Sequence, residues 1–367
     1  MKLRFPLLHY IVTTGCLYTW QSMKNCVRIL IGRGPYSDEH LVFFRQYVLH
    51  RLGLRRIWAV TCTESSVKEG AGSLASLAMC TINFARVSGL AYLHSPLSNA
   101  DHADRPMQQW AAAWESLFNL GAGEEPCNGR RRGVIDAGSY SLRELDLCFG
   151  LRYREKELLE GFRALIPDFR HKYYLDKSPR TTDEVTIAVH IRRGDVSADE
   201  NSYLYTSTAQ VLRMASEVKS TLESHKVPFN IRIYSQGDVA DFAELLPLGV
   251  EFFLDADPIW TIQELIEADI LILSKGNFSY CAGVISDGIK ICEPYLDEPP
   301  DGVWQMPNAG LPARALAFSW PIFSELETWI PCQLDGTIDR TAFERQLTLL
   351  LQAKEKARTT GSSLASR

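Results

Sequence analysis

The sequence lacks the patterns that mark a zinc site, a membrane span or a repeat. Its nine cysteines form no CxxC pair and have no histidine partners at zinc-finger spacing, which argues against a metal site. No uninterrupted apolar run reaches the roughly 20 residues that span a bilayer. The chain also contains no internal repeat and no low-complexity block.

A strong positive charge is missing as well. The net charge is -5 at pH 7, which argues against a protein that coats nucleic acid, and we expect no nucleic-acid partner. Hydrophobic residues make up 46% and charged residues 23% of the chain, as in a soluble globular protein with a sizeable core. Any anion binding must therefore come from local clusters of basic residues.

The odd number of cysteines favours reduced core residues over a secreted disulfide framework, because several, such as Cys62 and Cys80, lie in apolar segments. A cytoplasmic location is the favoured interpretation. At the N-terminus, however, Lys2 and Arg4 precede LLHYIVTTGCLYTW, which is similar to a signal peptide or signal anchor. We interpret residues 1–54 as an N-terminal extension, and an anchor in the ER or Golgi membrane is the alternative.

The length of 367 residues predicts two domains. The stretch DKSPRTTDE has no apolar residue other than proline, and we place the boundary there, near residue 180. The prediction is a Rossmann-like domain at 55–180, a second one at 181–300, and a C-terminal segment with a terminal helix and a frayed tail at 301–367.

Strand and helix patterns alternate in both halves, which predicts parallel sheets with helices on both faces, an α/β fold. The first half has expected strands at 56–63, 90–97 and 134–138, and expected helices at 74–87, 107–121 and, ending at Pro167, within 142–173. The second half has expected strands at 185–191, 229–237, 250–255, 269–274 and 288–295, with helices at 207–225, 238–246, 259–268, 278–286 and 343–358.

The most informative motif is HIRRGD, which directly follows the apolar strand VTIAV. Ligands of open α/β sheets bind at the carboxyl ends of strands, so Arg192 and Arg193 are expected near a crevice. The planar guanidinium fork suits a phosphate or diphosphate. Gly194 allows a sharp turn, and Asp195 can hold one arginine in position. An arginine and aspartate pair that only caps a surface loop is the alternative.

A second polar turn follows the predicted strand DILILS. Ser274, Gly276, Asn277 and Ser279 crowd the junction between this strand and the next helix. Backbone N-H groups and hydroxyls at such a junction can face an anion, although Ser and Asn also cap helices routinely. Together with HIRRGD, this turn predicts a two-sided cradle for a diphosphate.

These motifs resemble the metal-independent fucosyltransferase superfamily, whose members have the GT-B fold, two Rossmann-like domains facing a central cleft, and use GDP-fucose. The likeness covers about residues 55–300. It implies that Arg192 binds the donor diphosphate, with Arg193 as a supporting cation, and that His190, Gly194 and the 276–279 turn, Phe278 included, contact the donor. The chain departs from the family where Gly276 and Asn277 replace paired serines. One expected outcome is the loss of a hydroxyl contact to the phosphates, and the alternative is that Asn277 and the backbone substitute for it.

Three further segments fit this resemblance. EGAGSLASL is similar to the glycine loop that approaches the donor phosphates, with Gly70 and Gly72 matching and Ser73 and Leu74 replacing the usual polar pair; a simple tight turn is the alternative. On the acceptor side the candidates are His94, His102 and Glu115, although a structural or surface role is the favoured interpretation of each histidine. The loop at 121–133 is expected to help select the acceptor.

The string DAD, residues 255–257, does not indicate a metal site. Arginine can neutralise the diphosphate without a cation, and Asp257 precedes a proline as a helix-entry signal. Asp255 is instead expected to contact the guanine or ribose of the donor, by likeness to similar enzymes.

The resemblance implies an inverting transfer of fucose from GDP-fucose to a glycan or glycoprotein, with no cofactor or metal besides the donor. Asp195, Glu115, His94 and His102 are candidate general bases by residue type only. A catalytically silent binding protein of the same fold, or a transferase that uses another GDP- or UDP-sugar, are the alternatives.

Overall fold

The computed structural model describes two sheets and the helices between and around them. The described residues are 56–63, 70–97, 104–129, 132–136, 155–180, 182–199, 204–293 and 328–365. Side chains are not described at 155–159 and 360–365. The expected N-terminal extension and the stretch 301–327 of the C-terminal segment lie outside these ranges.

The first sheet has four parallel strands in the order β3-β2-β1-β4. These strands are β1 (Ala59–Thr61), β2 (Ala91–His94), β3 (Glu125–Pro126) and β4 (Val134–Asp136). Three of them were expected, although each is shorter than its sequence pattern. β3 was missed because it has only two residues, both exposed, and lies within the stretch 121–133 that we interpreted as a loop.

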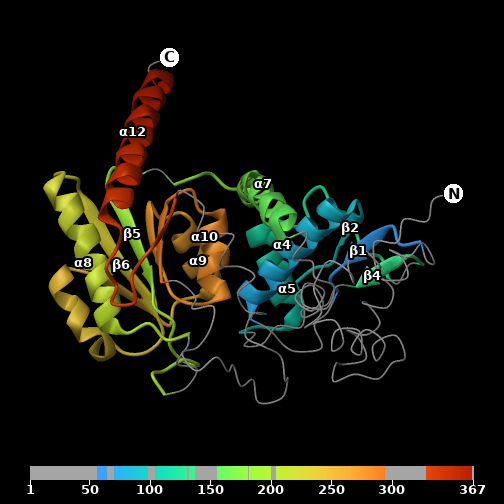
Figure 1. The fold of residues 1–367 in the computed structure, drawn as a ribbon, viewed down its shortest axis with the longest axis horizontal. Helices are drawn as coiled ribbons and strands as arrows, with labels where there is room; N and C mark the ends of the chain where they lie inside the picture. The colour runs from blue at the N-terminus through green and yellow to red at the C-terminus, as the bar shows by residue number, and fades with distance from the viewer. Residues whose placement is uncertain are drawn as a thin grey trace, which may run out of the picture.

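Three helices pack beside this sheet (Figure 1). The first, α4 (Ala71–Ser88), ends as predicted at Gly89, which has a left-handed φ of 67°. The second, α5 (Met107–Phe118), ends at Asn119 (φ 52°) and not at Gly121, because asparagine also tolerates this conformation. The third, α7 (Glu155–Tyr173), continues through Pro167, where an end was predicted.

Burial explains why Pro167 does not end α7. A proline inside a helix removes one backbone hydrogen bond and costs about 3 kcal/mol. On either side of it, Phe162, Leu165, Phe169 and Tyr173 are all buried, so the helix presents one continuous apolar face. Burying an aromatic or leucine side chain contributes roughly 1.5–3 kcal/mol each, which outweighs the lost hydrogen bond.

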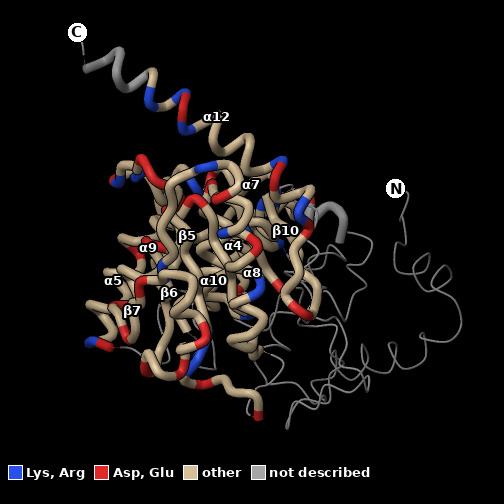
Figure 2. The backbone as a smooth tube through the Cα atoms, turned by 90° about the vertical axis from the view of Figure 1, so that its left-hand side faces the viewer, with Lys and Arg blue, Asp and Glu red and all other residues tan. Residues whose placement is uncertain are grey.

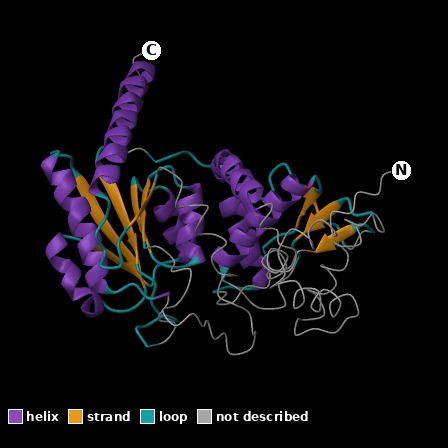
Figure 3. Ribbon diagram, viewed as in Figure 1, coloured by secondary structure: helices purple, strands orange, loops and turns teal. Residues whose placement is uncertain are grey.

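The second sheet has six parallel strands in the order β10-β9-β8-β5-β6-β7. The strands are β5 (Val185–His190), β6 (Phe229–Ser235), β7 (Glu251–Leu254), β8 (Ile270–Leu273), β9 (Ile289–Cys292) and β10 (Trp329–Pro331). All but β10 were predicted. Every strand of the first sheet precedes residue 180 and every strand of the second follows it, and the predicted α/β class with two parallel sheets is confirmed (Figure 3).

Helices cover both faces of the second sheet (Figure 1). The predicted helices are present as α8 (Thr208–Ser224), α9 (Pro258–Ile266), α10 (Asn277–Ile285) and the 3-10 segment η4 (Val239–Leu248). The terminal helix α12 (Arg340–Ala365) extends through most of the stretch that we expected to fray. Its first turns pack through Phe343 and Leu347, and its later turns project beyond the body with charges of both signs (Figure 2).

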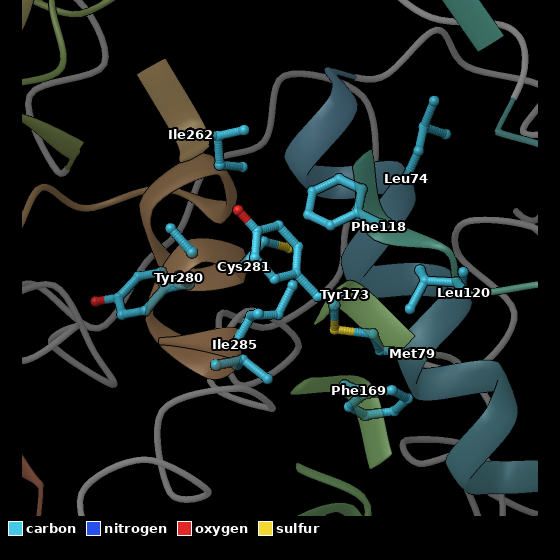
Figure 4. Close-up of a cluster of buried hydrophobic side chains, with 14 of the residues drawn as sticks. Leu74, Met79, Phe118, Leu120, Phe169, Tyr173, Ile262, Tyr280, Cys281 and Ile285 are labelled. Carbon is cyan, nitrogen blue, oxygen red and sulfur yellow. The ribbon is translucent and has the colours of Figure 1, made fainter. Parts of the chain in front are cut away.

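The two halves share one hydrophobic core, which lies between their facing helices. It joins buried side chains of α4, α5 and α7 to those of α9 and α10. Figure 4 shows Met79, Phe118 and Phe169 of the first half close to Cys281 and Ile285 of the second. The donor cleft between the halves stays a prediction. Because the facing helices share a core, this cleft is expected only at the edge where α4 and α10 begin.

Polar contacts also join the halves. From α7, Arg170 donates hydrogen bonds to the carbonyl oxygens of Ile285 (3.0 Å) and Ser286 (2.7 Å) at the end of α10. Arg180, in the connecting segment, binds both carboxylate oxygens of the buried Glu264 on α9. These contacts fix the connection between the sheets.

The six cysteines in the described ranges carry free thiols: Cys62, Cys80, Cys127, Cys281, Cys292 and Cys332. The expectation of reduced cysteines is confirmed for these six. Burial raises the pKa of Cys62 and of Cys281 to about 12, so both thiols stay protonated at neutral pH. Within the described ranges no helix combines the length and the apolar composition needed to cross a bilayer.

A fully buried lysine lies on the sheet face that packs against α10. Lys290, in β9, donates a hydrogen bond of 2.6 Å to the carbonyl oxygen of Ser286. Burial, and next the positive charge of Arg170, lower its pKa to about 7, while Asp287 acts in the opposite direction. Between pH 7 and about pH 10.4, Lys290 is therefore protonated in the unfolded chain but neutral in the folded protein.

We therefore expect the stability of the protein to rise with pH between about 7 and 10 through this group, with no contribution to the slope below pH 7. Lys290→Met should raise the free energy of unfolding at neutral pH by a few kcal/mol, because the cost of burying the charge disappears. Urea unfolding of both proteins at pH 6.5, 8 and 9.5 measures the difference. A difference that does not shrink towards pH 9.5 would contradict the assignment.

Candidate functional site

The two predicted motifs lie side by side at the carboxyl edge of the second sheet. β5 and β8 are neighbours, but the chain proceeds from β5 to β6 and β7 on one side and from β8 to β9 and β10 on the other. This is the topological switch point at which open α/β sheets bind their ligands. HIRRGD leaves the end of β5 and SKGN leaves the end of β8, so both motifs flank the switch point.

Arg192 lies over the beginning of α10. Its Nε and Nη2 atoms donate to the two carboxylate oxygens of Asp195, at 3.2 and 2.6 Å. A Cβ atom on Gly276, the N-cap residue of α10, would lie only 2.8 Å from Nη1 of Arg192. The missing side chain at Gly276 thus leaves the space that the guanidinium occupies, and Asp195 orients it as predicted.

His190 and two serines form a compact hydrogen-bonded group, and His190 lies close enough to Arg192 to feel its charge. The Nδ1 atom lies 2.7 Å from Oγ of Ser274 and 2.5 Å from Oγ of Ser279, and the two hydroxyls are 2.9 Å apart. Burial, and then the charge of Arg192, lower the pKa of His190 to about 3, so the ring is neutral at physiological pH. Its Nδ1 atom can accept from one of the two hydroxyls while the ring carries its proton on Nε2.

The first turns of α4 and α10 pack directly on each other. A Cβ atom on Gly72 would lie 2.4 Å from the backbone nitrogen of Phe278, so only glycine fits between the two helices. Gly70, by contrast, is exposed at the start of α4 and has open space beside it. The Nδ2 atom of Asn277 donates to Oγ of Ser73 at 2.8 Å. Ser73 and Asn277, two of the four positions at which the motifs depart from the expected pattern, are therefore in direct contact.

Aromatic rings pack around Phe278 in the first turn of α10. The ring of Phe278 lies 5.3 Å from that of His190 and 6.4 Å from that of Trp114 on α5. Trp114 is buried and stacks on Phe118 one turn further along the helix. The first half thus supplies the wall against which the 276–279 turn rests.

Arg193 has partners other than those of Arg192, and its expected role as a supporting cation stays a prediction. Its guanidinium packs on the ring of Tyr205, 4.5 Å from the centroid, and donates to the carbonyl oxygens of Arg192 (2.8 Å) and Thr206 (3.2 Å). Burial lowers its pKa below the ordinary arginine value. These contacts hold the loop after β5 together.

The remaining donor-side candidates lie on the same sheet edge. Gly194 has a φ of 85°, and a Cβ atom there would lie 2.4 Å from the side chain of Gln236. Asp255 is exposed after β7, where its carboxylate accepts from the backbone N-H of Gly237 at 3.4 Å. Asp257 caps α9 through the N-H of Trp260, which confirms it as a helix-entry residue.

The acceptor-side candidates His94 and Glu115 lie together in the first half. Nε2 of His94 is 2.9 Å from the carboxylate of Glu115, and Nδ1 is 3.2 Å from the hydroxyl of Tyr92. Glu115 also accepts from the backbone N-H of Leu97 at 2.7 Å. With both ring nitrogens engaged and Gly121 packed against the ring, His94 has the structural role that we favoured. His102 lies outside the described residues.

The arrangement suits an anion with at least two charged oxygens. The first turn of a helix has N-H groups without intrahelical partners, and the N-cap Gly276 supplies no side-chain acceptor to α10. Arg192 adds a permanent positive charge beside these groups, with its side chain 29% exposed. Such a pairing of a guanidinium with a helix N-terminus binds phosphate or diphosphate groups.

Comparison with known proteins gives no match to a protein-family model and none to a curated protein. Among solved structures, the fucosyltransferase NodZ from Bradyrhizobium is 11% identical, with a TM-score of 0.30 over 63% of this chain and 93% of its own. POFUT1 in complex with GDP-fucose is 12% identical, with a TM-score of 0.32 over 64% of this chain and 95% of its own. We draw no functional conclusion from likeness at this level.

Proposed function

We propose that this chain is a metal-independent, inverting glycosyltransferase that moves fucose from GDP-fucose to a hydroxyl group of a glycan or protein. The observation that carries the proposal is the guanidinium of Arg192, which Asp195 holds over the uncapped N-terminus of α10. The choice of donor is supported by the resemblance of the HIRRGD and FSY motifs to the fucosyltransferase superfamily.

In the proposed reaction the acceptor hydroxyl attacks C1 of the sugar while GDP departs. The transition state resembles an oxocarbenium ion, and negative charge accumulates on the leaving diphosphate. Arg192 and the N-H groups of α10 are fixed before the reaction and stabilise this charge as it develops. Because His94 and Glu115 are engaged with each other, we assign neither as the general base.

A catalytically silent binding protein is the second candidate, and one contact favours it. The side chain of Asn277 is bonded to Ser73 of the first half, at a position where the resemblance implies a serine hydroxyl for the donor phosphates. A protein that has lost this contact could still bind a nucleotide sugar. Release of GDP from GDP-fucose in the presence of glycan acceptors would distinguish the transferase from the binder.

A thermal-shift panel with GDP, GDP-fucose, UDP and ADP tests the proposed ligand. We expect GDP and GDP-fucose to raise the melting temperature, because a ligand at 100 times its Kd stabilises the native state by about 2.7 kcal/mol. UDP and ADP should have smaller effects. A larger shift with UDP would replace the proposed donor by a UDP-sugar, and no shift with any nucleotide would contradict the proposal.

A further inference from the structure

A buried ion pair lies next to the candidate site and takes no part in the proposed chemistry. Nζ of Lys275 is 2.8 Å from Oε1 of Glu293, and the two side chains are only 10% and 4% exposed. Lys275 stands between Ser274 and Gly276 in the turn after β8, and Glu293 follows β9. The pair therefore lies at the same sheet edge as HIRRGD.

Both members of the pair contact the same short segment of chain, residues 204–208. Lys275 donates to the carbonyl oxygen of Tyr205 at 3.1 Å, and Glu293 accepts from the hydroxyl of Thr206 at 3.1 Å. Arg193 approaches this segment from the other side, through the ring of Tyr205 and the carbonyl oxygen of Thr206. Charged groups from three adjacent strand ends thus converge on two residues.

The same contacts lead back to Arg192. Nη1 of Arg193 donates to the carbonyl oxygen of Thr206 and also to the carbonyl oxygen of Arg192, the latter at 2.8 Å. A displacement of Tyr205 and Thr206 would release Arg193 and, with it, the backbone of Arg192. The position of the phosphate-binding guanidinium therefore depends on the buried pair three contacts away.

Stability alone does not account for such a pair. Removing two charges from water costs several kcal/mol per ion, and replacing a buried ion pair with apolar side chains of similar size is often neutral or stabilising. What apolar side chains could not supply are the hydrogen bonds to Tyr205 and Thr206. Partners of this kind, which orient a binding group, typically change affinity by roughly 10- to 100-fold when they are removed.

We propose that Lys275 and Glu293 are positioning residues: they fix the 204–208 segment, and through Arg193 they hold Arg192 in place for an anionic nucleotide. The identity of that ligand rests on the proposed function. The pair itself touches no ligand and contributes little to stability relative to an apolar pair.

The double variant Lys275→Met/Glu293→Met tests this inference. We expect it to melt near the wild-type temperature, to bind GDP roughly 10- to 100-fold more weakly, and to exchange its amide hydrogens faster at 204–208. Lys354→Met is the matched control, because Lys354 pairs with Asp269 at the opposite end of β8, at 2.9 Å. The control should keep the wild-type affinity for GDP.

Unchanged GDP affinity in the double variant overturns the inference, whatever its exchange rates. If the wild-type protein binds no GDP, the proposed function fails, and hydrogen exchange then decides the inference alone: wild-type protection at 204–208 overturns it and loss of protection supports it. If the double variant does not fold, Thr206→Val replaces it, since this change removes the hydroxyl that donates to Glu293 and should likewise weaken GDP binding; unchanged affinity in this variant also overturns the inference.

Discussion

Arg192→Ala is expected to lower kcat for sugar transfer by roughly 10² or more, the usual loss when one key donor to a developing charge is removed. This corresponds to about 3 kcal/mol of transition-state stabilisation. Folding should be little affected, because Arg192 is 29% exposed and its partner Asp195 is 49% exposed, and such pairs contribute about 0–1 kcal/mol. Steady-state kinetics with GDP-fucose, beside a melting curve, measure both quantities.

Arg213→Ala is the matched control for this experiment. Arg213 also pairs with an aspartate, Asp335, and both side chains are about half exposed, but the pair joins α8 to the turn before α12. We expect wild-type kcat from this variant. Near wild-type turnover from Arg192→Ala would refute the central role of the guanidinium, and an equal loss from both variants would show a general effect of charge.

The second sheet was predictable because its strands are short, apolar and separated by clear helical patterns. The strand before HIRRGD and the strand before SKGN were correctly located, and parallel pairing then placed both motifs at one edge. The order of the strands in the sheet could not be predicted from the sequence pattern, because it depends on which strands form hydrogen bonds with each other. It is this order that makes β5 and β8 neighbours.

The sequence pattern did not reveal side-chain contacts between residues that lie far apart in the chain. Adjacent arginines look alike in the sequence, yet Asp195 orients Arg192 beside Gly276 at the start of α10, while Arg193 packs on the ring of Tyr205. Lys275 gave no signal, because its partner Glu293 lies 18 positions further along the chain. The sequence pattern also did not show that burial of one apolar face lets α7 continue through Pro167.

Gly72→Ala is expected to destabilise the protein by about 1–3 kcal/mol, the usual cost of inserting an extra carbon into a packed interface. The new Cβ would lie 2.4 Å from the nitrogen, 2.5 Å from Cα of Phe278 and 2.7 Å from the carbonyl carbon of Asn277. All three atoms belong to the backbone, so no side-chain rotation can relieve the contact. The first turn of α10 must move, and its N-H groups move with it, so GDP affinity should fall as well.

Gly70→Ala separates this steric effect from a general sensitivity to alanine in the same loop. Gly70 has a φ of -67°, which alanine adopts without strain, and a Cβ atom there would meet nothing within 4 Å. Its stability should stay within about 0.5 kcal/mol of wild type. Denaturant unfolding compares the two variants directly. Equal stability of Gly72→Ala and Gly70→Ala would mean that α4 and α10 are not in direct backbone contact. The first turn of α4 would then not pack against the 276–279 turn of the proposed anion site.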